Sequence, residues 1–269
     1  MKIIISHDVD HITAWEHKKD LTIPKFIFRN SIELAIRKAG FREYFLRFME
    51  LAKNKFQNLE ELMGFDKENK VPSTFFVGVN NGLGLAYSLD DANYWIKKII
   101  ENGFDVGVHG IEFDNFWGIK KEYEVFENLS DLKKFGIRMH YLNNSEHTLK
   151  LLDEAGYLFD STLDRLENPF KTGNLWEFPL HIMDSCIFHQ NSRWQNQTLD
   201  QAKSTTQRTI EEADKKGINY LTVLFHDRYF SNSFRSWKDW YAWVVFSLKD
   251  TGFEFTTYRE AIRQLEKGE

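Results

Sequence analysis

The chain begins with Met1-Lys-Ile-Ile-Ile-Ser-His-Asp-Val-Asp-His11, an apolar run that leads into two aspartates with a histidine on either side. The apolar run predicts a short buried strand, and the aspartates then lie where this strand passes into a loop. Burying two like charges so close together costs free energy unless a cation or a reaction requires them. The stretch therefore indicates a functional site at the end of the first strand.

The rest of the chain repeats one unit, an amphipathic helix followed by a glycine and a short apolar strand. The clearest helix begins after Ser88, whose capping-box partner is Asp91, and ends at Gly103, which suits a left-handed helix terminator before the strand at 104–108. Similar junctions lie at 136–139, 156–159, 217–225 and 252–255. Together with 3–5, 74–77 and 175–180, they predict about seven or eight strands, parallel and joined by helical crossovers.

An α/β barrel and an open doubly wound sheet both fit this alternation. The residues that follow the strands distinguish between these two folds. Reactive side chains follow most of the strands, namely Asp8 and Asp10, His109, Arg138 and His140, Asp160, and His226 with Asp227. Side chains from so many strands collect at one face when the sheet closes on itself. An open sheet gathers its site at one switch point and usually carries a glycine-rich phosphate loop, which this sequence lacks. The pattern favours a barrel.

Residues 12–70 interrupt the alternation and are helical in character, so we expect a helical insertion beside the barrel mouth in a single domain spanning 1–269. A net charge of −5 and a pI near 6.0 give no electrostatic footprint for nucleic acid. One cysteine, Cys186, excludes a disulfide framework and a thiolate zinc cluster within the chain. With no visible signal peptide and no apolar run near the ~20 residues of a membrane span, we expect a cytoplasmic protein.

Six motifs make the chain resemble the polysaccharide deacetylases of the NodB-homology type (carbohydrate esterase family 4), in particular a branch linked to O-antigen and surface-polysaccharide biosynthesis. In chain order they are Asp8-Val-Asp10, Ser73-Thr-Phe-Phe76, Val106-Gly-Val-His109, Arg138-Met-His-Tyr141, Phe159-Asp-Ser-Thr162 and Leu221-Thr-Val-Leu-Phe-His226. The resemblance covers nearly the whole chain. It implies a distorted (β/α) barrel and a metal-dependent hydrolase that removes the N-acetyl group from an amino sugar of a polysaccharide or glycan precursor.

The resemblance also implies a role for the motif residues. Asp8 becomes the general base and Arg138 the residue that orients it, while His226 becomes the general acid. Asp10 and His109 become ligands of a divalent metal, zinc in particular. These roles are chemically coherent, because a bound metal polarises the acetamide carbonyl and acidifies the attacking water. A carboxylate can then take the proton of the water, and an imidazolium can protonate the departing amine.

Two positions depart from the family pattern. The second metal-binding histidine of the family, four residues after the first, is replaced here by Phe113. Glu112 or Asp114 could supply the missing ligand, since one histidine and two carboxylates still suit a divalent cation. His140 stands where the family has proline, and we expect it to contact the substrate or to pack in the mouth.

Other residues are expected to support the site. Asp160 or Asp184 would hold His226 in the correct tautomer, and the sequence does not choose between them. Trp117 and Tyr141 lie beside motif residues and are expected to contact sugar rings, whereas the helically spaced Trp237, Trp240 and Trp243 indicate a packed helix face. Two further functions remain open. The missing histidine is consistent with a catalytically silent sugar-binding or scaffold protein, and the same barrel could act as an O-acetyl esterase or glycosidase.

Overall fold

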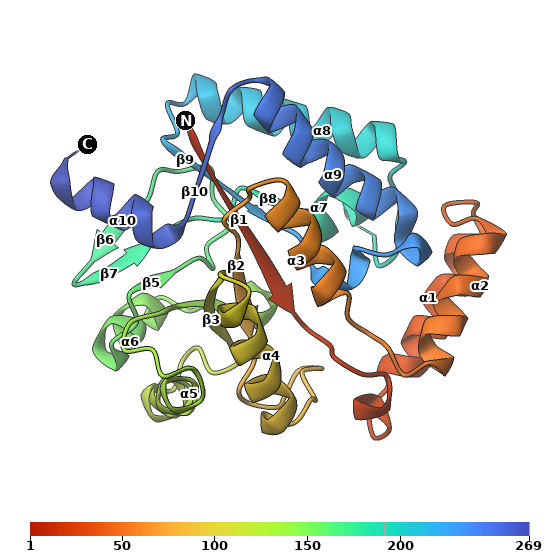
Figure 1. The fold of residues 1–269 in the computed structure, drawn as a ribbon, viewed down its shortest axis with the longest axis horizontal. Coiled ribbons are helices and arrows are strands. Elements are labelled where there is room, and N and C mark those ends of the chain that lie inside the picture. Colours follow the sequence, from red (N-terminus) through yellow and green to blue (C-terminus); the bar gives the residue numbers. More distant parts are fainter. Residues whose placement is uncertain (191, 269) are drawn as a thin grey trace.

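The first strand organises the sheet in the computed structural model, which describes residues 1–190 and 192–268 (Figure 1). β1 (Lys2–Val9) pairs in parallel with three strands, β9 (Tyr220–Leu224) and β10 (Glu254–Thr256) along its first half and β2 (Thr74–Val77) along its second half. The sheet continues through β3 (Asp105–Gly110), β4 (Gly136–Met139) and β5 (Phe159–Asp160), all parallel. The predicted parallel strands with helical crossovers are therefore confirmed.

β1 extends further than the sequence suggested. We expected Asp8 in a loop, but Ser6–Val9 pairs with Thr74–Val77, so Asp8 lies within the strand. Its side chains alternate between two environments, as strand geometry requires. Ile3 and Ile5 pack in the core outside the sheet, whereas Ile4 packs inside the barrel with an aromatic group of Phe76, Phe159, Phe178, Tyr220 and Tyr258. Asp8 has the same parity as Ile4 and faces the interior.

A short segment closes the sheet into a distorted barrel. β6 (Phe170–Thr172) forms a hairpin with β7 (Leu175–Glu177), and β7 pairs with β5. Leu180 then forms a bridge with Asp164, and β8 (Ile182–Met183) pairs with β9. The segment 175–183 therefore contacts β5 at one end and β9 at the other. The predicted fold class is confirmed, although the three-residue strand β6 and the two-residue strand β8 were not anticipated.

Helices surround this sheet in Figure 1. They are α3 (Leu59–Glu68), α4 (Leu89–Glu101), α5 (Phe116–Ser130), α6 (Thr148–Ala155), α7 (Asp184–His189), α8 (Leu199–Lys215), α9 (Arg235–Asp250) and α10 (Tyr258–Lys267). α4 begins as predicted, with Asp91 N donating to Ser88 Oγ at 3.1 Å, and Gly103 after it has a φ of 87°. α10 packs against the interior residues at the amino-terminal end of the barrel, where Gln264 accepts from Lys2 Nζ at 2.8 Å. The opposite end is thus left for a site.

The predicted insertion consists of the 3-10 helix η1 (Trp15–His17), α1 (Thr22–Ala35), α2 (Phe41–Ala52) and α3. α1 and α2 project from the barrel beside the carboxyl end of β1 (Figure 1). α2 is fixed there by Arg47, whose Nε donates to the backbone oxygen of Ser233 in the 3-10 helix η4 (Asn232–Phe234) at 2.8 Å. Among the described residues, no helix combines the length and apolar character that crossing a membrane requires.

Close packing between β4 and β5 predicts a large effect of one methyl group. A Cβ added at Gly136 would overlap the ring of Phe159, whereas a Cβ at Gly64, within α3, meets no atom within 4 Å. We expect Gly136→Ala to lower the free energy of unfolding by ~1–3 kcal/mol through overpacking. Gly64→Ala should raise it by ~0.5–1 kcal/mol, because alanine favours the helix. Urea unfolding of both variants measures this, and equal midpoints would contradict it.

Candidate active site

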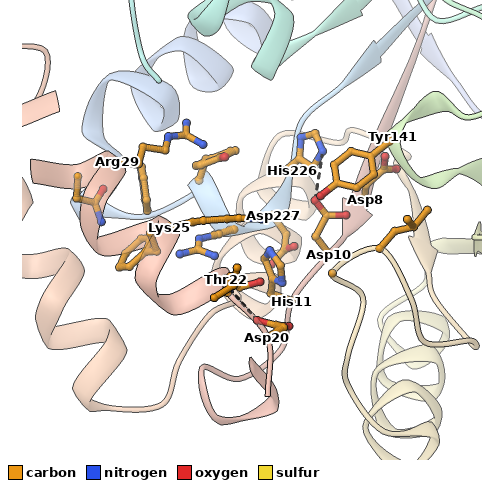
Figure 2. A pocket seen from close by; sticks show the side chains of 18 residues that line it. Asp8, Asp10, His11, Asp20, Thr22, Lys25, Arg29, Tyr141, His226 and Asp227 are labelled. Atoms are coloured by element: carbon orange, nitrogen blue, oxygen red, sulfur yellow. Dashed lines mark hydrogen bonds and ion pairs between the residues drawn. The ribbon is translucent and has the colours of Figure 1, made fainter. Parts of the chain in front are cut away.

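A cavity of about 360 Å³ lies where β1 and β9 end, between the barrel and α1 (Figure 2). Asp8, within β1, and Asp10, directly after it, line the cavity. His226 and Asp227, in the chain that follows β9, line it as well. Tyr141 lines it from the 3-10 helix η2 (His140–Leu142). The carboxyl ends of several strands therefore meet at this cavity, as the barrel prediction requires.

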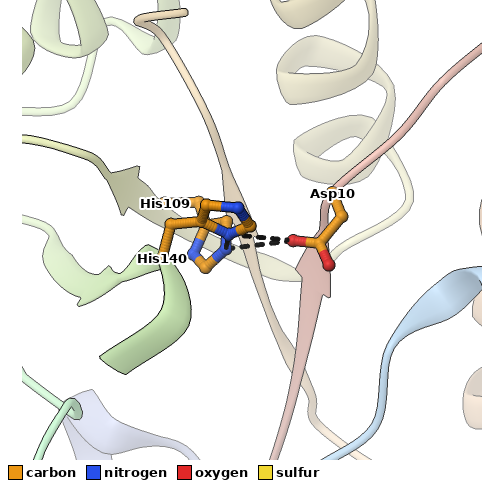
Figure 3. Close-up of side chains that lie close together, drawn as sticks. All are labelled: Asp10, His109 and His140. Atoms are coloured by element: carbon orange, nitrogen blue, oxygen red, sulfur yellow. Dashed lines mark hydrogen bonds and ion pairs between the residues drawn. The ribbon is translucent and has the colours of Figure 1, made fainter. Parts of the chain in front are cut away.

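Three side chains beside this cavity bring their ligand atoms together (Figure 3). Asp10 Oδ1 lies 3.1 Å from His109 Nε2 and 3.3 Å from His140 Nδ1, and the two ring nitrogens lie 2.9 Å apart. A tetrahedral metal with ligands at ~2.0–2.2 Å separates its ligand atoms by ~3.3–3.6 Å. The spacing of the group is close to this value.

Hydrogen bonds at the far side of each ring determine which nitrogens face inward. His109 Nδ1 donates to the backbone oxygen of Arg138 at 3.1 Å, and His140 Nε2 donates to that of Leu83 at 3.2 Å. Since carbonyls only accept, the remaining nitrogen of each ring faces the other ring and Asp10. In the neutral rings these nitrogens carry lone pairs that a cation between them would accept, and backbone carbonyls behind metal-bound imidazoles are a common arrangement. The group therefore fits a divalent cation.

The sequence offered Glu112 and Asp114 as ligands, and the structure brings neither into this group. The chain after β3 is drawn toward α5, because the backbone N–H groups of Ile111 and Glu112 donate to the Glu122 carboxylate at 3.2 and 3.4 Å. The Glu112 side chain lies against Gly118, and Asp114 is exposed. His140, expected to contact the substrate or to pack in the mouth, lies beside Asp10 and His109 in this group.

Burial raises the pKa of Glu122 to about 7, although Asn80 and the two backbone N–H groups oppose the shift. A folded-state pKa above the unfolded value of ~4.3 means that the folded state binds more protons, so stability falls as pH rises from about 4.5 through 7. Between pH 5 and pH 8, we expect the free energy of unfolding to fall by ~1–3 kcal/mol more in wild type than in Glu122→Gln. Urea unfolding at both pH values measures the difference. Glu124→Gln, exposed on the same helix, should behave like wild type, and parallel pH profiles for all three would contradict the assignment.

Asp8 is held by Arg138 inside the barrel. Its Oδ1 accepts from Arg138 Nη1 at 3.1 Å, and its Oδ2 lies 3.9 Å from His109 Nδ1. Arg138 is fully buried, with its guanidinium over the ring of Phe76. The other donors of this guanidinium bind Ser6, Ser161 and Tyr258 at 2.8–2.9 Å. The guanidinium is thus fixed by β1, by the residue after β5 and by α10, and it fixes the carboxylate in turn.

His226 approaches the group from the other side. Its Nε2 lies 3.6 Å from Asp10 Oδ2, while its Nδ1 donates to Asp184 Oδ1 at 2.7 Å and its backbone N–H donates to Asp184 Oδ2 at 2.8 Å. Burial alone would lower the pKa of His226, but Asp184, Asp10 and Asp8 raise it well above its usual value. These carboxylates favour the protonated ring, whose Nε2–H would face Asp10 and the cavity.

Of the two aspartates proposed to hold His226, the structure places Asp184 there. Asp160 is fully buried and accepts instead from Thr162 Oγ1 at 2.6 Å. Burial raises its pKa and that of its neighbour Glu177. The two aspartates separate because Asp160 ends β5 inside the sheet, whereas Asp184 begins α7 directly after β8, which pairs with β9 beside His226.

The two aromatic residues expected to contact sugar lie in different places, one at the cavity and one away from it. Tyr141 lines the cavity, with a φ of 56° that is uncommon outside glycine. Trp117 is 77% exposed at the start of α5 and is not among the residues that line the cavity. Sequence reasoning missed the loop after β2, where Leu83 and Gly84 line the cavity and Leu83 orients His140. The turn signal Asn80-Asn-Gly-Leu-Gly84 could have identified it.

The sequence matches no known family model and no curated protein. Solved structures nevertheless share its fold. A protein described as a polysaccharide deacetylase from Mycobacterium smegmatis has a TM-score of 0.66 at 17% identity, over 99% of this chain and 90% of that chain. An allantoinase has a TM-score of 0.62 at 10% identity, over 97% and 88%. A carbohydrate esterase family 4 pseudoenzyme from Bacillus anthracis has a TM-score of 0.50 at 11% identity, over 96% and 64%.

These comparisons confirm, at the level of the fold, the resemblance that the six motifs suggested. At such low identities the likeness establishes the distorted barrel of the polysaccharide deacetylases and not the activity of this chain. An allantoinase and a pseudoenzyme share the barrel. The function must therefore be argued from the residues at the cavity.

Proposed function

We propose that the protein is a metal-dependent hydrolase that removes the N-acetyl group from an amino sugar of a polysaccharide or glycan precursor. One observation carries this proposal. The Asp10–His109–His140 group lies between a buried carboxylate held by Arg138 and an imidazolium held by Asp184, all beside one cavity. Amide hydrolysis needs these three components, namely an electrophile, a base and an acid.

Asp10, His109 and His140 would hold the cation, and two nitrogens with one carboxylate oxygen suit zinc. When bound, the cation would polarise the acetyl carbonyl and lower the pKa of the attacking water. Asp8 takes the proton from that water, and Arg138 keeps the Asp8 carboxylate oriented toward the cavity. His226 gives the proton on its Nε2 to the departing amine, while Asp184 keeps Nδ1 protonated and the ring in place.

His140 also bears on the alternative of a catalytically silent protein. That alternative rested on the missing second histidine after His109. His140 from η2 would bring the group to three ligands and would leave a fourth position for water or substrate, the usual arrangement of catalytic zinc. The donor set therefore favours an active enzyme over a sugar-binding module.

Acetate release tests the proposal. The purified chain, loaded with zinc, should release acetate from N-acetylated amino-sugar oligosaccharides, and a chelator should abolish the release. Release from O-acetylated sugars alone would reassign the protein as an esterase. A fully metal-loaded protein that binds the sugars without releasing acetate would support the silent alternative instead.

A further inference from the structure

A second cluster of metal-ligating side chains lies directly after Asp10 and plays no part in the proposed reaction. His11, Glu16 and His17 bring one ligand atom each into contact. His17 Nε2 lies 2.9 Å from His11 Nδ1 and 3.1 Å from Glu16 Oε1, and His11 Nδ1 lies 3.8 Å from the same oxygen. These separations bracket the ~3.3–3.6 Å expected between ligand atoms of a tetrahedral metal at ~2.0–2.2 Å.

Two members of the cluster, His17 and Glu16, are held in position by contacts outside it. His17 Nδ1 donates to Asp20 Oδ2 at 2.8 Å, so its Nε2 is the nitrogen that faces His11 and Glu16. The Glu16 carboxylate accepts from the backbone N–H groups of Ile12 at 3.1 Å and Thr13 at 2.8 Å. A carboxylate behind a ligand histidine and a ligand carboxylate fixed by hydrogen bonds are the supports that metal sites commonly carry.

The surroundings of the cluster suit a bound cation. The side chains of Glu16 and His17 are almost fully buried, and the ring of Phe56 lies 6.0 Å from both imidazoles as an apolar wall. Arg228 is the cation that faces the cluster, with its guanidinium stacked on Phe56 and acting on His11. The carboxylates of Glu16 and Asp20, which contact His17, outweigh this single charge. One side remains open, because His11 and Asp20 line the cavity (Figure 2).

We propose that His11, Glu16 and His17 form a second divalent-cation site, separate from the Asp10 group and open to the same cavity. Two histidines and one glutamate are a donor set that holds zinc in proteins while leaving a fourth position free. Here that position faces the cavity, where a hydroxyl or phosphate oxygen of a ligand can reach it. Asp20 is a positioning residue that directs His17 Nε2 toward the cation.

Metal stoichiometry tests this site. Wild type is stripped with a chelator, loaded with zinc alone, freed of unbound ion and analysed by elemental mass spectrometry. We expect about two equivalents per chain for wild type and about one for His17→Ala, Glu16→Gln or His140→Ala. Combining His17→Ala with His140→Ala should remove both. His147→Ala, which removes a histidine with a 71% exposed side chain, should keep about two equivalents.

A second variant and a second readout guard against misfolding. Asp20→Asn keeps every ligand, and we expect it to weaken zinc binding at this site by ~10–100-fold while the other equivalent stays bound. Cobalt loading should give tetrahedral absorption bands that lose one component in His17→Ala. About one equivalent in wild type, lost entirely in His140→Ala, would overturn the proposal, as would two equivalents retained in His17→Ala. These outcomes do not depend on acetate release, so this site and the proposed function can fail separately.

Discussion

Asp8→Asn should lower the rate of acetate release by ~10²–10⁴-fold while leaving the zinc content unchanged. The carboxylate is the base of the proposed reaction, and an amide cannot accept the proton of the attacking water. Asparagine keeps the shape of the side chain and can still accept from Arg138 Nη1. Asp8 lies outside the Asp10–His109–His140 group, so the ligands stay in place. Initial rates and metal analysis on the same preparation measure both quantities.

Asp227→Asn is a matched control for this prediction, because Asp227 lines the same cavity. Burial raises the pKa of Asp227 to about 8, so its carboxyl is neutral at pH 7 and cannot act as the base there. Its Oδ2 accepts from the backbone N–H of Asn58 at 3.0 Å, a contact that asparagine can reproduce. We expect Asp227→Asn to release acetate at a rate within about tenfold of the wild-type rate. A rate for Asp8→Asn that also stays in this range would refute the role of Asp8.

The sequence was most informative where function depends on the ends of regular parallel strands. Asp10, His109 and His226 each lie at or just after the end of a strand with a clear apolar pattern, so their convergence could be predicted once a closed sheet was inferred. The predicted helix cap at Ser88 also agrees with the structure, because both capping partners lie within one turn of chain. Local patterns and parallel topology therefore carried most of the fold.

Contacts between distant loops were beyond the sequence. His140 joins Asp10 and His109 because Leu83, from the loop after β2, accepts from its ring, and because Glu122 draws the chain after His109 away. Neither interaction leaves a periodic signal. The choice between Asp160 and Asp184 likewise depended on β8, a two-residue strand whose pairing with β9 is decided by tertiary contacts. Spacing from His109 pointed to Glu112 or Asp114, which the structure does not bring into the group.

The barrel alone decides little about chemistry, since a pseudoenzyme and an allantoinase both share it. The chemistry depends instead on how the buried polar groups of this chain are paired. Asp8 lies against Arg138, Asp184 lies against His226, and Asp66 lies against His7 on the outer face of β1. Buried ions cost free energy unless they are paired. The charges at the cavity are therefore arranged in advance of any substrate.

The largest effect on stability should come from Arg138→Met. Arg138 is fully buried and makes hydrogen bonds to Ser6, Asp8, Ser161 and Tyr258. Its removal leaves the Asp8 carboxylate buried without its cation, and breaking a buried pair in this way costs ~3–5 kcal/mol. Arg259→Met is the control, because the Arg259–Asp105 pair is partly exposed and its loss should cost ~0–1 kcal/mol. Urea unfolding compares the two.

A double-mutant cycle separates the charge of Asp8 from the packing of Arg138. The unpaired carboxylate is expected to cause much of the stability lost in Arg138→Met. Adding Asp8→Asn to Arg138→Met should then raise the free energy of unfolding by ~1–3 kcal/mol. In wild type, the same Asp8→Asn change removes a favourable pair. Additive effects of the two substitutions would instead assign the loss to the contacts of Arg138 with Ser6, Ser161 and Tyr258. A coupling energy of the expected sign would mean that the carboxylate proposed as the base stays charged in the barrel because Arg138 compensates its charge.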